Sequence, residues 1–274
     1  MPELPEVESV RTGLEKLIKG KKITNAKVLW PRIIAEPNRI EDFEQRIVGQ
    51  TIHSIDRRGK FLIFHLSKDV LISHLRMEGK YRIEKKEVPF SKHTHVILEL
   101  DEEAELRYLD VRKFGRMSLI EHSELENHPS LKKLGPEPIE EGLLIEPFQL
   151  NLKKRKKSIK AVLLDQTIVA GIGNIYADEI LYEASIHPER YADSLKVEEV
   201  QTLRTAILDV MRKAVAAGGT TIRTYQNAFG ETGAYQAQLN VYGRSGLNCR
   251  RCGNTIEKIK VAQRGTHFCP VCQD

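Results

Sequence analysis

The chain has 274 residues, with 43 Lys and Arg against 38 Asp and Glu, and a formal net charge of +5 at pH 7. Its apolar share of 41% and charged share of 30% are those of a globular protein, and its length predicts two domains with separate cores. The basic excess is compatible with a polyanionic partner without identifying one. The sequence has no apolar run of about 18 residues and no charged-then-apolar leader, so we expect no membrane span and no secretory signal. A cytoplasmic location is therefore favoured.

The first three residues, Met1-Pro2-Glu3, pair a potential nucleophile with an acid. If Met1 is removed, Pro2 becomes the terminus and carries a secondary amine, with the Glu3 carboxylate beside it. An α-amino group has an unperturbed pKa of about 7.7 to 8.0, so part of it is neutral and nucleophilic near neutral pH. A proline near a start codon usually has no such role, so the pair gains weight only from the rest of the chain.

A helix is predicted from residue 5 to the glycine at position 20. Pro5 lies near its first position, Glu6 and Glu8 lie in its first turn, and Gly20 is placed to end it. Apolar side chains recur on one face, at Val7, Val10, Leu14, Leu17 and Ile18. This face predicts packing on a core that anchors the terminus, as a catalytic amine requires.

Short segments with strand character follow, most of them separated by turn residues. They are residues 23–30, 51–55, 61–66, 70–75, 96–100, 106–111 and 117–120. Regular short strands of this kind predict a two-sheet β-sandwich or a flattened barrel of about 120 residues.

Several polar residues interrupt this pattern where turns are expected. Lys60 precedes the apolar run 61–64 at the mouth of a strand, where most lysines are only solvated. A polar cluster occupies residues 74–78, and His93 and His95 begin the next strand. An H-x-H pair on a strand points both side chains to one face and can ligate metal, but no third ligand is spaced nearby. We therefore interpret these histidines as polar surface or DNA contacts.

The composition changes after residue 120. Residues 121–146 are acidic and contain prolines, with a rigid turn-rich connection at 135–138, which predicts a domain boundary. A dense cationic block then opens an apolar helix through residues 162–164. The block consists of Lys153, Lys154, Arg155, Lys156, Lys157 and Lys160. Charge runs are usually solvated faces, but this block adjoins a second candidate for phosphate binding.

That candidate is residues 169–179, in which two glycines and Asn174 precede a helical stretch. Asn174 or a neighbour can cap a helix whose amides face a phosphate. A lone G-x-G is a weak signal, and the third glycine of a dinucleotide fingerprint is missing. A longer helix with a core stripe from residue 197 to 215 ends at Gly218-Gly219, and residues 220–238 have the polar composition of a mobile functional loop.

The strongest motif is Cys249-x2-Cys252 with Cys269-x2-Cys272, which uses every cysteine of the chain. The spacing matches a site for one structural Zn²⁺ with four thiolates, and two disulfides are the alternative. The metal is favoured because cytosolic thiols are kept reduced. The intervening residues predict a hairpin with strands at 255–261 and 266–268, too small to fold without the metal.

Taken together, the motifs resemble bacterial formamidopyrimidine-DNA glycosylases, members of the formamidopyrimidine-DNA glycosylase/endonuclease VIII family. The motifs are PELPEVE, RRGKFL, SHLRMEGKY, DVRKFG, LGPEP, QTIVAGIGNIYADE and RGTHFCPVC, and they span essentially the whole chain. The resemblance implies an α+β fold with an N-terminal β-sandwich and helix, a helical domain with a helix-two-turn-helix, and a β-hairpin zinc finger. It implies a catalytic domain at 1–133, a linker at 134–152, a DNA-binding helical domain with a lesion loop at 153–238, and a zinc finger at 239–274.

The resemblance also implies a bifunctional repair enzyme that flips an oxidised purine out of duplex DNA and cuts both the glycosidic bond and the strand. Pro2 would attack C1′ and form a Schiff base, with Glu3 as acid and base and Glu6 in support. Lys60 matches the catalytic lysine of the family, and Arg264 matches the zinc-hairpin arginine that grips a phosphate.

The remaining matches concern DNA and the lesion. A triplet that fills the gap left by the extruded base and contacts the orphaned cytosine is matched by Met77, Arg112 and Phe114. Other DNA contacts are implied at His74, His93, Lys156, Lys160, Asn174 and Tyr242. Lesion recognition is implied at Glu78, Thr220, Thr221, Ile222, Arg223, Thr224 and Tyr225. The implied partner is double-stranded DNA with an oxidised purine, preferably opposite cytosine, bound by a monomer in the bacterial cytoplasm at the nucleoid.

Two positions depart from the family pattern. Gln263 stands where the family usually has glycine before the zinc-hairpin arginine, and a positive φ there would strain the turn and shift Arg264. The connection at 102–104 lacks a common aspartate-glycine turn, which we expect to be neutral.

Two alternatives compete with this interpretation. The endonuclease VIII branch favours oxidised pyrimidines, and both the PELPEVE start and the triplet of Met77, Arg112 and Phe114 argue against it. A zinc-containing DNA-binding protein without catalysis would require loss of the amine, yet Pro2, Glu3, Lys60 and Arg264 are all in place.

Overall fold

The structure, a computed structural model, describes residues 1–101, 104–220 and 234–274. The turn residues Glu102 and Glu103 lie outside the described part. So do the expected lesion-loop residues Thr221, Ile222, Arg223, Thr224 and Tyr225. The chain divides into two compact units. The first unit contains Met1–Lys132 and the described residues 218–220, and the second contains Lys133–Ala217 and Ala234–Asp274.

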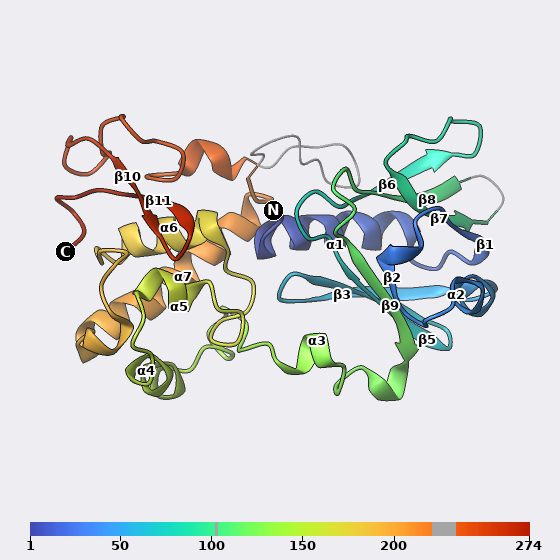
Figure 1. The fold of residues 1–274 in the computed structure, drawn as a ribbon, viewed down its shortest axis with the longest axis horizontal. Coiled ribbons are helices and arrows are strands. Elements are labelled where there is room, and N and C mark those ends of the chain that lie inside the picture. The colour runs from blue at the N-terminus through green and yellow to red at the C-terminus, as the bar shows by residue number, and fades with distance from the viewer. Residues whose placement is uncertain (102–103, 221–233) are drawn as a thin grey trace. The chain divides into compact units, whose positions relative to one another are not determined.

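The first unit is built on two β-sheets (Figure 1). One sheet is antiparallel and has the order β1 (Ile23–Val28), β7 (Thr94–Leu100), β8 (Ala104–Leu109) and β6 (Lys80–Lys85). The other has the order β2 (Ile34–Glu36), β9 (Arg116–Glu121), β5 (Asp69–His74), β4 (Phe61–Leu66) and β3 (Ile52–Arg58). Within it only the short β2 pairs in parallel, with β9. The prediction of a two-sheet sandwich in an α+β fold is confirmed.

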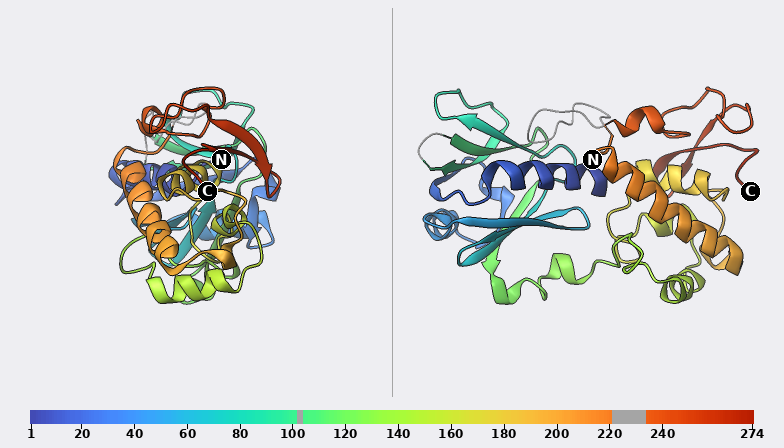
Figure 2. Two further views of the ribbon diagram at one scale, coloured as in Figure 1. Left: turned by 90° about the vertical axis from the view of Figure 1, so that its left-hand side faces the viewer. Right: turned by 180° about the vertical axis from the view of Figure 1, so that it is seen from behind.

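Helix α1 (Leu4–Ile18), dark blue in Figure 2, packs mainly on β3 and β4. Its apolar face joins a core that both sheets share, with Val7, Val10, Leu14 and Ile18 almost fully buried. Gly20 follows in the left-handed region, with φ of 80°, where glycine has no steric penalty. The expected helix therefore exists and starts one residue earlier than predicted.

The elements of the first unit that were not predicted include β2, β6 and the helix α2 (Ile40–Ile47). In β6 the residues alternate with charges and only Tyr81 is buried, so no apolar run marks the strand. In α2 only Phe43 and Ile47 are buried, which is too few for a helical period to be recognised. A short helix α3 (Pro129–Lys132) ends the unit.

The second unit is helical, with a terminal hairpin. Its helices are α4 (Ile145–Lys153), α5 (Ile159–Leu163), α6 (Asn174–Glu183) and α7 (Val197–Ala216). Its strands are β10 (Glu257–Val261) and β11 (Arg264–Phe268), which pair antiparallel. Most of α4 lies in the segment 134–152, which was expected to be a linker. A helix forms there because Phe148 and Leu152 are buried against the rest of the unit. None of the helices in the described ranges is long and apolar enough to cross a membrane.

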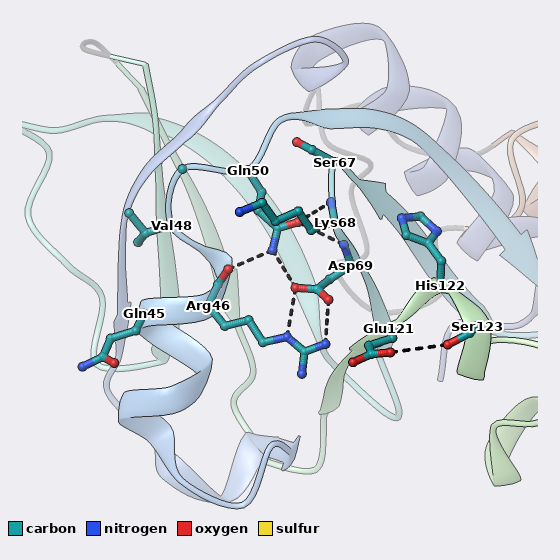
Figure 3. Close-up of a pocket in the computed structure, with 11 residues that line it drawn as sticks. Gln45, Arg46, Val48, Gln50, Ser67, Lys68, Asp69, Glu121, His122 and Ser123 are labelled. Carbon is teal, nitrogen blue, oxygen red and sulfur yellow. Dashed lines mark hydrogen bonds and ion pairs between the residues drawn. The ribbon is translucent and has the colours of Figure 1, made fainter.

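Arg46, Gln50 and Asp69 form a polar cluster at the end of α2 (Figure 3). The Arg46 guanidinium donates to both oxygens of Asp69, at 2.6 and 3.0 Å, and Gln50 Nε2 donates to Asp69 Oδ2 at 2.7 Å. Gln50 Oε1 accepts the amides of Lys68 and Asp69. Burial by itself raises the pKa of the Asp69 carboxyl, but the bonds from Arg46 and Gln50 outweigh burial and hold the pKa below its usual range. The cluster ties α2 to the start of β5.

Replacing Asp69 with Asn is expected to lower the free energy of unfolding by about 1–3 kcal/mol near neutral pH, because Arg46 and Gln50 lose a charged acceptor. The folded pKa of Asp69 lies below the unfolded value, so its stabilisation is present above about pH 4 and lost as pH falls through the folded pKa. Urea unfolding of the two chains should therefore converge at acid pH. Glu41→Gln, in an exposed pair 3.7 Å from Arg39, is the control and should change little. Equal losses at all pH values would contradict the prediction.

Candidate functional site

The N-terminus is held by a reciprocal cap on α1. Glu3 is the N-cap residue, and its side chain accepts the Glu6 amide, while Glu6 Oε2 accepts the Glu3 amide at 2.8 Å. This capping box satisfies amides that the first helical turn leaves without partners. Pro2 and Glu3 are both buried, and Met1 is half exposed. The Pro2 nitrogen is thus held at the start of a packed helix.

The other oxygen of Glu6 contacts a segment more than two hundred positions away in the chain. Glu6 Oε1 accepts the Thr220 amide at 2.7 Å and the Thr220 hydroxyl at 3.1 Å. Gly219 has a φ of 79°, and a Cβ there would lie 2.6 Å from Glu6 Oε1. Glycine is therefore required for this close approach. Glu6 joins the N-terminus to Thr220, the one residue of the expected lesion set in that segment that the structure describes.

Lys60 lies in the two-residue turn between β3 and β4, after Gly59 with φ of 56°. It is 5% exposed, so it is not the solvated lysine that its sequence context favours. Phe61 pairs with His74 across β4 and β5, which brings Lys60 near the imidazole. Burial, followed by the charges of Arg76 and Lys60, lowers the pKa of His74 to about 3. His74 is therefore neutral near pH 7, and its Nδ1 accepts the Arg76 amide at 2.9 Å.

The expected gap-filling residues lie on two turns that meet at Tyr108. One turn ends at Gly79 and carries Met77, and the other ends at Gly115 and carries Arg112 and Phe114. A Cβ at either glycine would overlap the Tyr108 hydroxyl. Tyr108 is 1% exposed, so a rigid core side chain sets the approach of both turns. Met77 is half-buried, whereas Arg112 and Phe114 are exposed. The Arg112 guanidinium carbon lies 4.7 Å from the centroid of the Phe114 ring.

Asp110 organises the second turn. Its carboxylate accepts the amides of Arg112, Phe114 and Gly115 at 2.8–2.9 Å. Asp110 was not identified from the sequence, because it lies inside the strand predicted at 106–111, whereas β8 ends at Leu109.

The two histidines ahead of this turn have different environments. His95 Nε2 contacts the Asp110 carbonyl at 2.7 Å, and His95 is 3% exposed. The interpretation of His95 as surface or a DNA contact is therefore wrong, because its imidazole is used inside the sandwich. His93 is half-buried, and its carbonyl accepts the Asp110 amide.

In the second unit, the cationic block divides between surface and interior. Lys156 is exposed. Lys160 is fully buried, and its ammonium donates to Asp178 Oδ1 at 2.5 Å, Thr266 Oγ1 at 2.7 Å and the Gly265 carbonyl at 3.2 Å. Lys160 was expected to contact DNA, but in the structure its side chain is turned toward the hairpin. Burial of this kind needs a counter-charge, which Asp178 supplies.

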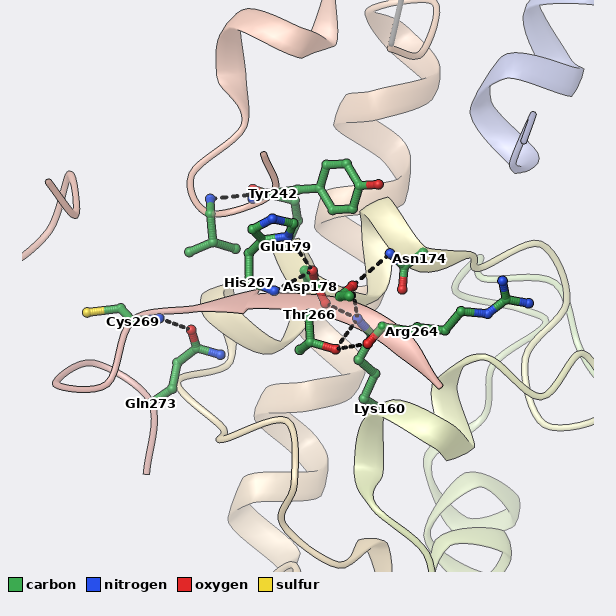
Figure 4. Close-up of polar contacts among 12 residues, drawn as sticks. Lys160, Asn174, Asp178, Glu179, Tyr242, Arg264, Thr266, His267, Cys269 and Gln273 are labelled. Atoms are coloured by element: carbon green, nitrogen blue, oxygen red, sulfur yellow. Dashed lines mark hydrogen bonds and ion pairs between the residues drawn. The ribbon is translucent and has the colours of Figure 1, made fainter. Parts of the chain in front are cut away.

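Asn174 is the first residue of α6, and its neighbour Gly173 is the N-cap, which agrees with the expectation that Asn174 or a neighbour caps this helix. Its Nδ2 donates to the Gly265 carbonyl at 3.0 Å, the oxygen that Lys160 also contacts. The residue before Gly265 is Arg264, which is exposed and points away from this cluster (Figure 4). The clamp on Gly265 therefore orients the hairpin tip with its arginine outward.

Glu179 holds the segment that enters the zinc finger. Its buried carboxylate accepts the amides of Asn240, Val241 and Tyr242 at 2.8–2.9 Å. Burial raises the pKa of Glu179, and these bonds offset only part of the rise. The Tyr242 ring is half-buried and meets the edge of His267 at 5.0 Å.

The hairpin turn has two non-glycine residues in the left-handed region, Ala262 with φ of 49° and Gln263 with φ of 61°. Val261 pairs with Arg264, so these two residues form the whole loop. A two-residue loop of this kind favours Asn-Gly because both positions need positive φ. The expected strain at Gln263 is therefore present, next to Arg264.

The four cysteine sulfurs lie within 4.8 Å of one another. Cys249 and Cys272 sulfurs are 3.9 Å apart, and those of Cys252 and Cys269 are 3.5 Å apart, too far for a disulfide at about 2.05 Å. Four thiolates around a tetrahedral zinc at about 2.3 Å would lie about 3.8 Å from one another. Burial raises the pKa of the Cys249 thiol, but hydrogen bonds from the Tyr182 hydroxyl and nearby amides lower it to about 6. The donor set fits one Zn²⁺.

Loss of zinc is expected to unfold the hairpin, because the core beside the cysteines contains few side chains and metal binding is coupled to folding in such modules. Cys252→Ser is the suitable variant, since Cys252 is exposed and its replacement leaves the core intact. The zinc content measured by metal analysis should fall from one per chain toward none, and the amides of β10 and β11 should lose protection from hydrogen exchange. Protection in the first unit is the internal control. A zinc-free chain with a protected hairpin would overturn the assignment.

Replacing Gln263 with Gly should stabilise the hairpin by about 1 kcal/mol, because glycine adopts φ of 61° without the left-handed penalty. Hydrogen exchange of the β10 and β11 amides measures the change. Lys260→Gly, inside β10, is the matched control and should destabilise the same hairpin. If both glycines destabilise it equally, the turn is not strained.

Comparison with known proteins identifies related chains. Three family patterns match: the formamidopyrimidine-DNA glycosylase N-terminal domain at residues 1–117, the formamidopyrimidine-DNA glycosylase H2TH domain at 134–226, and a zinc finger found in FPG and IleRS at 246–274. The formamidopyrimidine-DNA glycosylase of Enterococcus faecalis is 57% identical over 273 residues, covering 100% of this chain and 97% of the relative. That of Ligilactobacillus salivarius is 53% identical and covers 100% and 99%.

Solved structures agree. The complex of wild-type Lactococcus lactis Fpg (MutM) with DNA containing N7-benzyl-Fapy-dG has a TM-score of 0.94 and 46% identity, over 100% of both chains. The complex of Lactococcus lactis Fpg with DNA containing an abasic site has a TM-score of 0.94 and 47% identity, over 99% of both chains. The chain therefore belongs to the formamidopyrimidine-DNA glycosylase family, as a DNA repair glycosylase with a zinc finger that holds one zinc ion.

Proposed function

We propose that this glycosylase excises oxidised purines, 8-oxoguanine and formamidopyrimidines, from duplex DNA and then cuts the strand by β- and δ-elimination. The observation that carries the proposal is the anchored N-terminus, where Pro2 precedes the Glu3 and Glu6 capping box. The names of the relatives and the Fapy-dG and abasic-site DNA in the related complexes support the substrate class.

The chemistry begins once Met1 is removed. The Pro2 nitrogen attacks C1′ of the damaged nucleoside, a nitrogen–carbon bond forms, and the bond from C1′ to the base breaks as the base leaves with the proton that the Pro2 nitrogen gives up. Glu3 donates a proton to O4′ as the C1′–O4′ bond breaks, and the lone pair of the Pro2 nitrogen forms an iminium with C1′. The cationic nitrogen withdraws electrons while the C2′ proton is lost, and the 3′ phosphate departs. A second elimination, in which the C4′ proton is lost, releases the 5′ phosphate, and water hydrolyses the iminium to free the sugar fragment from Pro2.

In the proposal, cations serve the two eliminations. Lys60 assists proton transfer and contacts a phosphate, and its burial beside a neutral His74 suits a role inside a site better than one on the surface. Arg264 holds a phosphate through the elimination, and its exposure at the tip of a clamped hairpin suits that role. Zinc would contribute folding of the hairpin, and no chemical step uses it.

DNA recognition is divided among several surfaces. Met77, Arg112 and Phe114 fill the gap left by the extruded base, which offsets part of the cost of unstacking, a few kcal/mol. Lys156, His93 and Tyr242 contact the DNA, and cationic contacts to phosphates give most non-specific affinity. We propose that Lys160 and Asn174 act through the hairpin clamp. The chain acts as a monomer in the bacterial cytoplasm, where its substrate lies.

Borohydride trapping on duplex DNA with 8-oxoguanine opposite cytosine tests the mechanism. Mature protein should give a covalent adduct whose peptide map places the DNA on Pro2. Glu3→Gln and Lys60→Met should lower the rate by about 10²–10⁴-fold with DNA affinity largely retained. The matched control is a chain with one extra residue before Pro2, which makes the nitrogen an amide and should give no adduct.

The outcomes separate the competing functions. Equal trapping by the extended chain would overturn the Pro2 mechanism, and base release without strand cleavage would overturn the lyase half. Faster excision of oxidised pyrimidines than of oxidised purines would favour the endonuclease VIII specificity instead. DNA binding without any base release would leave a binding protein.

A further inference from the structure

The only tryptophan of the chain, Trp30, lies against the turn that carries Arg112 and Phe114. Lys113 stands between those two residues, and its Nζ lies 3.9 Å from the centroid of the Trp30 ring. A cation within about 6 Å of an indole centroid is attracted by the ring face. Arg32 approaches the same ring at 5.9 Å. The indole therefore receives a cation from the turn itself and a second one from its own segment.

Lys113 has a left-handed backbone, with φ of 58°. A residue with a Cβ is disfavoured there and persists only when its surroundings hold it. Its direct neighbours Arg112 and Phe114 are exposed, so they supply few contacts to the protein that could hold the backbone. The Asp110 carboxylate holds amides on both sides of Lys113, and Trp30 holds the side chain of Lys113.

Trp30 can act as an anchor because it is itself fixed. Its ring packs on the sandwich core, and its amide donates to the His95 carbonyl at 3.3 Å. His95 in turn contacts the Asp110 carbonyl, and Arg116 Nη1 donates to the Arg32 carbonyl at 2.7 Å. The 29–33 segment and the 110–116 turn are thus connected at two places, through His95 and through Arg116.

We propose that Trp30 and Lys113 form a positioning pair, which holds the turn so that Arg112 and Phe114 are presented to DNA in one orientation. The inference rests on the proposed function only in that Arg112 and Phe114 enter the gap of the extruded base. Neither Trp30 nor Lys113 needs to touch the base. The pair reduces the freedom that Arg112 and Phe114 would otherwise lose on binding, so its loss weakens binding and relaxes the preference for cytosine opposite the gap.

A double-mutant cycle on DNA affinity tests the pair. The variants are Trp30→Leu, Lys113→Met and the two together, measured on labelled duplexes that contain a tetrahydrofuran abasic-site analogue opposite cytosine or adenine. Each single variant should bind the cytosine duplex about two- to fivefold more weakly and lose part of its preference over adenine. The double variant should be no worse than the singles, because both remove one contact. Lys113→Arg should restore wild-type binding, since a guanidinium can also lie on the indole.

Two controls separate positioning from charge and from stability. Lys27→Met removes the same charge from an exposed site of the first unit and should leave the cytosine preference unchanged. Lys113→Gly relieves the backbone strain, so its melting temperature should equal or exceed that of wild type while its binding weakens as in Lys113→Met. Trp30 fluorescence in the free protein should change in Lys113→Met and stay unchanged in Lys27→Met.

Three results would overturn the pair: additive losses in the double variant, which indicate a direct phosphate contact by Lys113; wild-type binding by Trp30→Leu; or unchanged Trp30 fluorescence in Lys113→Met. Binding to the abasic analogue and the fluorescence of free protein need no chemistry at Pro2. A failure of borohydride trapping would therefore leave this test intact, and a failure of this test would leave the trapping result intact.

Discussion

The carboxylate of Glu6 is the interaction on which the N-terminal part of the structure depends. One oxygen accepts the Glu3 amide, and the other accepts the amide and hydroxyl of Thr220. Glu6 is 3% exposed, so water competes little with these bonds, and no neutral side chain of the same size would accept all of them as strongly. The start of α1 and the described beginning of the 218–220 segment are thereby held at one point. Because Glu6 bonds to both Glu3 and Thr220, a displacement of Thr220 would act on the residue next to Pro2 through the Glu6 side chain.

The second unit solves a similar problem with a buried ion pair. Lys160 and Asp178 are both at most 1% exposed, and each has further partners on the hairpin, since Asp178 Oδ2 also accepts the His267 amide. Such a pair contributes little to stability when compared with apolar side chains, but it specifies one arrangement because a displaced partner would leave an uncompensated charge. The bonds from Lys160 and Asn174 to the Gly265 carbonyl hold the chain two residues after the strained Gln263. The hairpin tip is therefore fixed by its polar contacts to α5 and α6 as well as by zinc.

Sequence reasoning succeeded where the signal is local and periodic. The core stripes of α1 and α7, the apolar runs of β4 and β5 and the paired cysteines need only spacing to be recognised. It failed where burial depends on distant partners. His95 resembles a surface residue in its H-x-H context, yet it is buried with its imidazole against the Asp110 carbonyl, a partner just after another strand that the local pattern does not reveal. Lys160 belongs to a cationic run, yet it is buried because Asp178 and Thr266 supply its acceptors.

Family and metal site follow from the order of the amino acids, because the family motifs and the two cysteine pairs are recognised from residue type and spacing along the chain. The partners of each polar group are assigned only by three-dimensional packing. Glu6 meets Thr220, Tyr108 meets two glycines, and Lys113 meets Trp30 across stretches of chain that no local pattern relates. The physical reason is that a helix or strand has a period, whereas the acceptor of a buried charge or the face under a cation is set by how the elements are stacked.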